Sequence, residues 1–289
     1  MQPQRQLFGI TNIAVVGLVV VASAAVFLRL LYLGQDSLWW DELASVAYSG
    51  GDWQDFWRWE IQSESLNQVL YYLLLRFWLY LGESEFAIRS LSVIASVATV
   101  IAVFALGKRL FDVQTGLIAA LILAVHAFHI EFSQEARGYS LLTLLITLSS
   151  LFFVKSIDRP SWGNWASYAL TSVLAGYSHF FGPLVLIAHA SSLIFLSPRA
   201  VPWKRLVISW GGIGLLLVPL VYYALLRSVE KEPKASETNL DQFVMAFTGY
   251  GGYPLLAVYL IPILVVAIFA VKNWVSSWGR WRAGGMPSC

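Results

Sequence analysis

Residues 13–42 read IAVVGLVVVASAAVFLRLLYLGQDSLWWDE and decide the class of fold. The opening run of about 20 apolar residues is long enough to cross a bilayer as an α-helix. Because the apolar core of a cleaved signal peptide has only roughly 7–15 residues, we expect an uncleaved signal anchor. Asp41 and Glu42 follow the run, and a carboxylate at a membrane boundary is costly to desolvate. This acidic pair is therefore a candidate functional site.

The composition of the whole chain indicates a membrane protein. Of the 289 residues, 58% are hydrophobic and 12% are charged, and the mean hydropathy is +0.66. Globular domains have about a quarter of their residues charged. The predicted fold class is therefore all-α, a polytopic bundle of transmembrane helices. One cysteine, Cys289, allows neither an intrachain disulfide nor a cysteine-based metal site, and no basic stripe indicates a nucleic-acid partner.

The distribution of basic residues decides which apolar stretches cross the membrane. Cytoplasmic loops normally carry the excess of Lys and Arg, and the basic clusters fall on one side only if residues 66–82 do not cross. We expect this stretch, which is rich in tyrosine, to form an interfacial helix. The sequence thus predicts about eight spans with both termini in the cytoplasm. They cover residues 13–33, 87–107, 114–130, 138–154, 164–179, 182–197, 206–226 and 254–271.

This topology gives a single transmembrane domain, residues 1–289, with two long outer loops. The first loop, residues 34–86, is rich in tryptophan and acid, which predicts short helices along the membrane surface. The last outer loop covers residues 227–253. The tail, residues 276–289, resembles a truncated or shifted reading frame, so we expect the C-terminal portion to be cut short. Arg29, near the end of the first span, is expected to snorkel toward the headgroups.

The first chemical candidate is the acidic pair. The carboxylate of Asp41 or Glu42 could deprotonate an acceptor hydroxyl or hold a divalent cation. The alternative is a pair of acids that only favours the start of a helix through the macrodipole.

The second candidate follows the third span, where Glu131 and Glu135 stand four residues apart and Arg137 comes two residues later. If a helix continues there, both carboxylates share one face. Arg137 could clamp a phosphate while Glu135 positions a reacting hydroxyl. The alternative is an internal Glu–Arg pair that closes a tight turn. Because both candidates face the same compartment in the predicted topology, each strengthens the other.

Three further residues are candidates for substrate binding. Arg89 lies just inside the outer end of the second span, where it would bind a lipid phosphate or snorkel. His179 ends the fifth span and would bind substrate or hold a metal, or serve as a satisfied structural histidine. Tyr139 closes the second acidic cluster. The sequence fixes no set of metal ligands.

In this order, the features resemble the GT-C membrane glycosyltransferases, in the group of protein O-mannosyltransferases, aminoarabinose transferases and RgtA/B/C/D-like enzymes. The resemblance covers about residues 10–200. Its most specific part is Ser133-Gln134-Glu135-Ala136-Arg137, supported by the stretches 82–91, 107–111 and 177–182.

The resemblance implies a transferase in the cell membrane that takes a sugar from a polyprenyl-phosphate donor at the non-cytoplasmic face. The acceptor would be a protein, a lipid or a glycan. Carried over, Asp41 is the candidate base or metal-linked acid, Glu135 is the second acid, and Arg89 is a phosphate contact. A single displacement would invert the anomeric centre.

The chain departs from this family pattern where members carry His-Pro-Pro or a similar motif, because it has Asn67-Gln68-Val69 there. Two other functions stay open at this point. One is a non-enzymatic transporter or flippase, and the other is an inactive, truncated remnant of the transferase.

Overall fold

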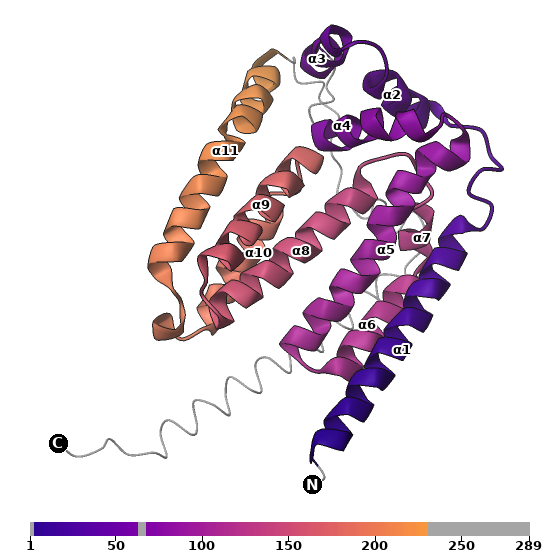
Figure 1. The fold of residues 1–289 in the computed structure, drawn as a ribbon. Coiled ribbons are helices and arrows are strands. Elements are labelled where there is room, and N and C mark those ends of the chain that lie inside the picture. The colour runs from indigo at the N-terminus through magenta and orange to yellow at the C-terminus, as the bar shows by residue number, and fades with distance from the viewer. Residues whose placement is uncertain (1–2, 63–67, 231–289) are drawn as a thin grey trace, which may run out of the picture. The chain divides into compact units, whose positions relative to one another are not determined.

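The computed structural model describes residues 3–62 and 68–230, and this part of the chain is helical without any strand (Figure 1). The chain divides into two compact units, Met1–Leu226 and Arg227–Cys289, and the description below concerns the first. The predicted loop 227–253, the span 254–271 and the tail 276–289 lie outside the described residues, apart from residues 227–230. Those three features, and the single domain, stay predictions.

The helices follow one another with short connections. In chain order they are α1 (Pro3–Leu30), α2 (Trp40–Ser49), α3 (Trp53–Gln62), α4 (Val69–Trp78), η2 (Leu79–Leu81), α5 (Glu85–Leu110), α6 (Val113–Ala124), α7 (Ala127–Glu131), α8 (Tyr139–Asp158), α9 (Trp162–Ser178), α10 (Leu184–Ser192), η3 (Leu193–Phe195), η4 (Pro198–Ala200) and α11 (Trp203–Glu230).

Four described helices are long and apolar enough to cross a membrane. They contain the segments Ile13–Leu30, Glu85–Leu110, Tyr139–Asp158 and Trp203–Tyr222. These segments overlap the predicted spans 13–33, 87–107, 138–154 and 206–226. The predicted spans 164–179 and 182–197 are the shorter helices α9 and α10 with η3. The total of eight spans therefore stays a prediction.

The predicted span 114–130 differs most from the structure. Helix α6 ends at Ala124, and α7 begins at Ala127 with the His126 side chain accepting a hydrogen bond from the His129 N–H. The guanidinium of Arg29 donates to the carbonyls of Leu123 and Ala124, which are among the last of α6. The last carbonyls of a helix lack the N–H partners of a continuing helix, and the Leu123 carbonyl accepts a short-range bond of 3.3 Å from the His126 N–H. The arginine therefore stabilises an early helix end.

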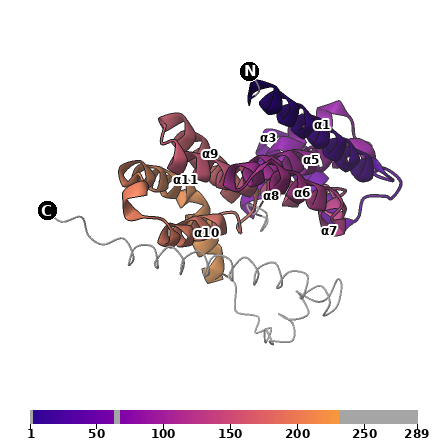
Figure 2. The same ribbon diagram turned by 90° about the horizontal axis from the view of Figure 1, so that it is seen from below.

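Helix α5 is the centre on which α1, α6 and α8 pack, and α8 contacts α9. A Cβ atom on Gly107 would lie only 2.9 Å from the Cα of Gly116, so glycine is required for this close approach of α5 to α6. Figure 2 shows α9, α10 and α11 gathered on one side of α8, away from α1 and α6.

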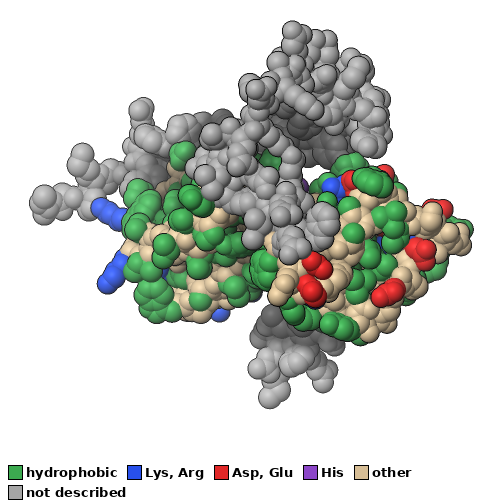
Figure 3. All heavy atoms as spheres, turned by 90° about the horizontal axis from the view of Figure 1, so that it is seen from above, with side chains coloured by type: hydrophobic (Ala, Val, Ile, Leu, Met, Phe, Trp, Pro, Cys, Tyr) green, Lys and Arg blue, Asp and Glu red, His purple; other side chains and the backbone are tan. Residues whose placement is uncertain are grey.

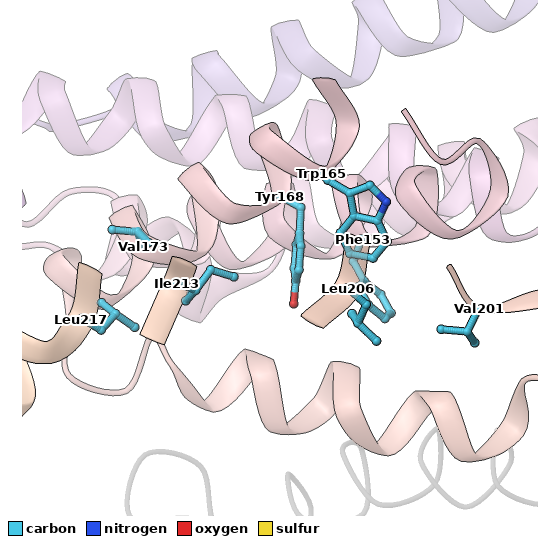
Figure 4. Close-up of a cluster of buried hydrophobic side chains, with 8 residues drawn as sticks. All are labelled: Phe153, Trp165, Tyr168, Val173, Val201, Leu206, Ile213 and Leu217. Carbon is cyan, nitrogen blue, oxygen red and sulfur yellow. The ribbon is translucent and has the colours of Figure 1, made fainter. Parts of the chain in front are cut away.

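A second core joins α8, α9 and α11. Phe153, Trp165, Tyr168 and Ile213 are among the buried residues of this cluster, whose side chains point toward one another (Figure 4). Tyr168 also accepts a hydrogen bond from the indole N–H of Trp210 at 3.0 Å. The hydroxyl is thereby satisfied inside the bundle, as buried polar groups require.

The basic connections lie together at one end of the helices. Arg109, after α5, forms an ion pair of 2.8 Å with Asp158 at the end of α8. The guanidinium of Arg205 lies 5.4 Å from the ring centre of Trp162, which joins the start of α11 to the start of α9. These contacts agree with the common side that the charge pattern predicts for the basic clusters.

The opposite end carries the short helices α2, α3 and α4, close to the end of α1 and the start of α5 (Figure 1). Helix α4 and η2 correspond to the stretch 66–82, and with ten residues α4 is too short to cross a bilayer. Figure 3 looks onto this end, and acidic side chains gather on one half of the visible face. The fold therefore brings the first outer loop to the end where α8 begins.

Candidate active site

Glu42 and Arg89 form a buried ion pair. Glu42 is fully buried on α2, and Arg89 lies in the first turns of α5 with 6% of its surface exposed. The Nε of Arg89 donates to Glu42 Oε1 at 2.9 Å, and Nη2 donates to Oε2 at 2.7 Å. This bidentate geometry fixes both side chains relative to each other.

The remaining donors of Arg89 are also used. Nη1 donates to the carbonyls of Leu33 and Asp36, and Nη2 donates to the carbonyl of Ser37 at 3.3 Å. A guanidinium has five N–H groups, and all five are therefore taken by protein acceptors. The expected contact of Arg89 with a lipid phosphate does not fit this geometry. The arginine instead holds the connection between α1 and α2.

Glu42 accepts two further hydrogen bonds from backbone N–H groups. They come from Ala136 at 2.8 Å and from Trp39 at 3.3 Å. With four donors around it, this carboxylate has no place for an acceptor hydroxyl or a metal ion. The expected catalytic role of Glu42 does not fit, because its oxygens connect α2 to the segment 132–138.

Asp41, one residue earlier, has a different environment. Its carboxylate forms an ion pair with Arg137 through Oδ2 and Nη1. The side chain of Asp41 is 37% exposed and that of Arg137 is 21% exposed, so the pair lies at an accessible position. The two acidic clusters, which are 96 residues apart in the chain, thus meet in space.

Aromatic rings surround the guanidinium of Arg137. Its central carbon lies 4.9 Å from the ring centre of Tyr139 and 5.7 Å from that of Trp39. The ring of Tyr139 lies 5.8 Å from that of His179, which is buried and accepts a hydrogen bond from the N–H of Phe181. Cation–π contacts restrict the orientation of Arg137. His179 therefore packs against Tyr139, and Tyr139 in turn contacts Arg137.

Glu135 is the second acid of the site. It is half-buried, and the described residues give its carboxyl group no hydrogen-bond donor. Burial raises its pKa above the ordinary value, Arg137 opposes this shift, and the charges of Glu42, Glu131 and Asp41 add to it. A carboxyl group with a raised pKa beside an ion pair is a common feature of acid–base sites.

The arrangement of Glu131 and Glu135 differs from a single helical face. Helix α7 ends at Glu131, and the backbone turns before α8 begins at Tyr139. Glu131 is exposed, whereas Glu135 is half-buried close to Asp41 and Arg137. The condition for a shared face, a continuous helix, is therefore not met.

The sequence reasoning missed the role of Gln68. Its Oε1 accepts a hydrogen bond of 2.8 Å from the N–H of Gly138, and its side chain is buried. A Cβ atom on Gly138 would lie 2.9 Å from this oxygen and 3.2 Å from the carbonyl of Ser178. Gln68 lies where the family pattern has His-Pro-Pro. This departure was the one feature of the sequence that could have drawn attention to Gln68.

A cavity of about 480 Å³ opens beside this site. It is lined by α6, α7 and α8 and is mostly apolar, with Phe128, Phe132, Leu142 and Tyr139 among the lining residues. Tyr139 belongs to both the cavity and the surroundings of Arg137.

A divalent metal, which the sequence left open, finds no group of three ligands among the described residues. No three side chains of His, Cys, Asp or Glu come together in the ranges 3–62 and 68–230. Glu42 is bound by four N–H donors, and Asp41 is paired with Arg137. These carboxylates do not fit the oxygen cage that a calcium ion needs or the open octahedral site of magnesium.

Comparison with known families gives a match over the middle and later part of the chain. Residues 68–223, more than half of the chain, match the family described as dolichyl-phosphate-mannose-protein mannosyltransferase. The match contains Glu135, Arg137, Tyr139 and His179, while Asp41 precedes it. A search of curated proteins found no match.

Proposed function

Because the chain belongs to the dolichyl-phosphate-mannose-protein mannosyltransferase family of membrane glycosyltransferases, we propose that it transfers a sugar from a polyprenyl-phosphate donor to a hydroxyl group. Transfer takes place at the non-cytoplasmic face of the cell membrane. The observation that carries this proposal is the ion pair between Asp41 and Arg137, which joins the two acidic clusters beside Glu135.

Arg137 is the proposed contact for the donor phosphate. One of its N–H groups donates to Asp41, and no other hydrogen bond to a described residue uses the guanidinium. Planar guanidinium groups bind phosphate oxygens bidentately. The rings of Trp39 and Tyr139 hold the plane of the group. Preorganised positive charge would then stabilise the phosphate as it leaves.

Asp41 is the proposed general base. Its Oδ2 is bound to Arg137, and no described residue donates to Oδ1. The acceptor oxygen attacks the anomeric carbon, and its proton passes to Asp41. The bond between the anomeric carbon and the phosphate oxygen breaks, and the phosphate keeps the electron pair. This single displacement inverts the anomeric centre, and base catalysis contributes roughly 10²–10⁴-fold.

Glu135 is the proposed positioning acid for the acceptor. Its half-buried carboxyl group lies within the electrostatic influence of Asp41 and Arg137. A hydrogen bond from the acceptor to Glu135 would orient the reacting hydroxyl toward Asp41. Such orientation lowers the entropic cost of the reaction.

The apolar cavity supports a lipid-linked donor. Its volume of about 480 Å³ holds several isoprene-sized groups. Tyr139 is part of the cavity wall and also contacts Arg137. A prenyl chain in the cavity would bring its phosphate to the guanidinium. Burial of the prenyl chain would provide most of the affinity, and the contact of Arg137 with the phosphate would fix the position of the donor along the cavity.

An assay with the reconstituted protein tests this function. The full chain in lipid nanodiscs is mixed with radiolabelled polyprenyl-phosphate mannose and candidate acceptors, and free polyprenyl phosphate and labelled acceptor are measured. A transferase releases both in equal amounts. In sealed vesicles, a flippase would move the donor across the bilayer without cleaving it, and an inactive remnant would do neither. Donors with other sugars are included as separate reactions.

A further inference from the structure

The side chain of Gln134 is fixed by the end of α1. Its Nε2 donates to the carbonyl of Leu31 at 2.8 Å and to the carbonyl of Arg29 at 3.1 Å. Gln134 immediately precedes Glu135. The end of the first membrane span therefore contacts the residue next to Glu135, the acid proposed to position the acceptor.

The end of α1, which Gln134 contacts, is itself fixed by hydrogen bonds of the Arg29 side chain. The sequence predicted that Arg29 snorkels toward the headgroups, but its side chain is fully buried in the structure. All five of its N–H groups donate to neutral acceptors on α1, α5, α6 and α7. The acceptors are Ser96 Oγ at 2.7 Å, the carbonyls of Ala25 and Ala124 at 3.0 Å, the carbonyl of Leu123 at 3.4 Å and His129 Nδ1 at 2.7 Å.

A buried arginine without a carboxylate partner is costly and is rare in a membrane span. Here its acceptors include two carbonyls near the C-terminal end of α6, which carries negative partial charge. The arrangement joins α1 to the point where α6 ends and α7 begins. It therefore fixes the backbone on which Gln134 docks.

Three polar contacts hold the segment 132–138 at every second position. Gln134 binds the end of α1, the N–H of Ala136 binds Glu42, and the N–H of Gly138 binds Gln68. Glu135 and Arg137 alternate with these anchored residues. The anchors fix the backbone on both sides of Glu135 and Arg137, and Arg137 forms its ion pair with Asp41 from this segment.

We propose that Gln134 is a positioning residue, which sets the placement of Glu135 and Arg137 relative to Asp41 by docking on the backbone of Arg29 and Leu31. Its effect on the order of the segment is independent of the reaction, and its effect on turnover rests on the proposed function. A displacement of 1 Å in a catalytic group can cost about 10²-fold in rate.

Two substitutions separate positioning from space filling. Gln134→Ala removes both the volume and the donor. Gln134→Glu keeps the shape but places carboxylate oxygens against two carbonyl oxygens, so docking is lost. Gln114→Ala is the matched control, because Gln114 is exposed at the start of α6, at the basic end of the molecule.

Hydrogen–deuterium exchange of the full chain in nanodiscs is the first measurement. We expect faster exchange in both Gln134 variants within the segment 132–138, and unchanged exchange in α5 and α8. The second measurement is the kinetics with polyprenyl-phosphate mannose. We expect kcat to fall about 10–100-fold, with the KM for the donor changed much less, because misplacement acts on the transition state.

The two measurements distinguish the possible failures. If the wild-type chain turns over no donor, the proposed function fails, and exchange still tests the docking of Gln134. If Gln134→Glu behaves like the wild type in both measurements, the proposal is overturned. It is also overturned if exchange rises throughout the helices, because that outcome indicates a general structural role.

Discussion

Arg89 and Glu42 form a bidentate, buried ion pair that joins the start of α5 to α2. The pair lies next to the ion pair of Asp41 and Arg137, which is partly exposed. One acid of the Asp-Glu sequence is therefore structural and the neighbouring acid is accessible. This division of roles follows from the helix, because successive residues on α2 point in different directions.

The buried pair gives the first prediction. Arg89→Ala leaves the Glu42 carboxylate buried without its main partner, so we expect a loss of about 3–5 kcal/mol in the free energy of unfolding. The measurement is equilibrium unfolding in mixed micelles. Glu83→Gln is the control, because Glu83 is exposed close to the start of α5. A loss equal to that of the control would contradict the structural role of the pair.

Arg137→Lys tests the proposed phosphate contact. Lysine keeps the charge but loses the planar donor pair and the stacking on Tyr139. Hydrogen bonds to charged groups contribute about 1.5–3 kcal/mol, so we expect kcat/KM for polyprenyl-phosphate mannose to fall about 10–100-fold. Arg159→Lys, at an exposed position at the basic end, should leave the value unchanged. Equal kinetics in the two variants would exclude Arg137 as the phosphate contact.

Glu135 gives a prediction on pH. Its pKa in the folded state is raised, mainly by burial, so the folded protein binds a proton more strongly than the unfolded chain does. The stability from this group is complete below the unfolded pKa and is lost as pH rises through the folded pKa. Glutamine does not titrate, so the Glu135→Gln variant does not lose this stability as the pH rises.

We therefore expect the melting temperature of Glu135→Gln to exceed that of the wild type increasingly as the pH rises from about 4 to 8. The measurement is thermal unfolding in nanodiscs across this range. Glu131→Gln is the matched control, because Glu131 is exposed at the end of α7. A constant difference between Glu135→Gln and the wild type at all pH values would contradict the raised pKa.

Thiol labelling tests the membrane topology. In a Cys289→Ser background, single cysteines replace Asp36, Glu131 and Arg159, all of which are exposed. We expect an impermeant maleimide added to intact cells to label positions 36 and 131, and to label position 159 only after lysis. Labelling of positions 36 and 131 from opposite sides would refute a shared compartment.

Much of the fold could be predicted from the sequence. The long apolar runs in α1, α5, α8 and α11 identify membrane-length helices, because hydrophobic length determines whether a helix can span. The early end of α6 could not be predicted. The apolar run continues to residue 130, and the break goes with the His126 cap of α7 and with the tertiary contact of Arg29 to the carbonyls of Leu123 and Ala124.

The site could be predicted only in part. The motif pattern gave Asp41, Glu135 and Arg137 as candidates, and the fold brings them together at one end of the helices. The structural roles of Glu42 and Arg89 could not be predicted, because a sequence does not reveal which of two adjacent acids is buried or which arginine pairs with it. Gln134 was also missed as an anchor, because its partners are backbone carbonyls and carry no signature in the sequence.

The central claim is that Asp41 removes the proton of the acceptor during sugar transfer. It is tested most directly by the single-turnover rate of Asp41→Asn with bound polyprenyl-phosphate sugar, compared with Asp36→Asn, in which an exposed loop side chain changes in the same way. We predict a rate reduced by about 10²–10⁴-fold for Asp41→Asn and a wild-type rate for Asp36→Asn. A wild-type rate for Asp41→Asn would contradict the account.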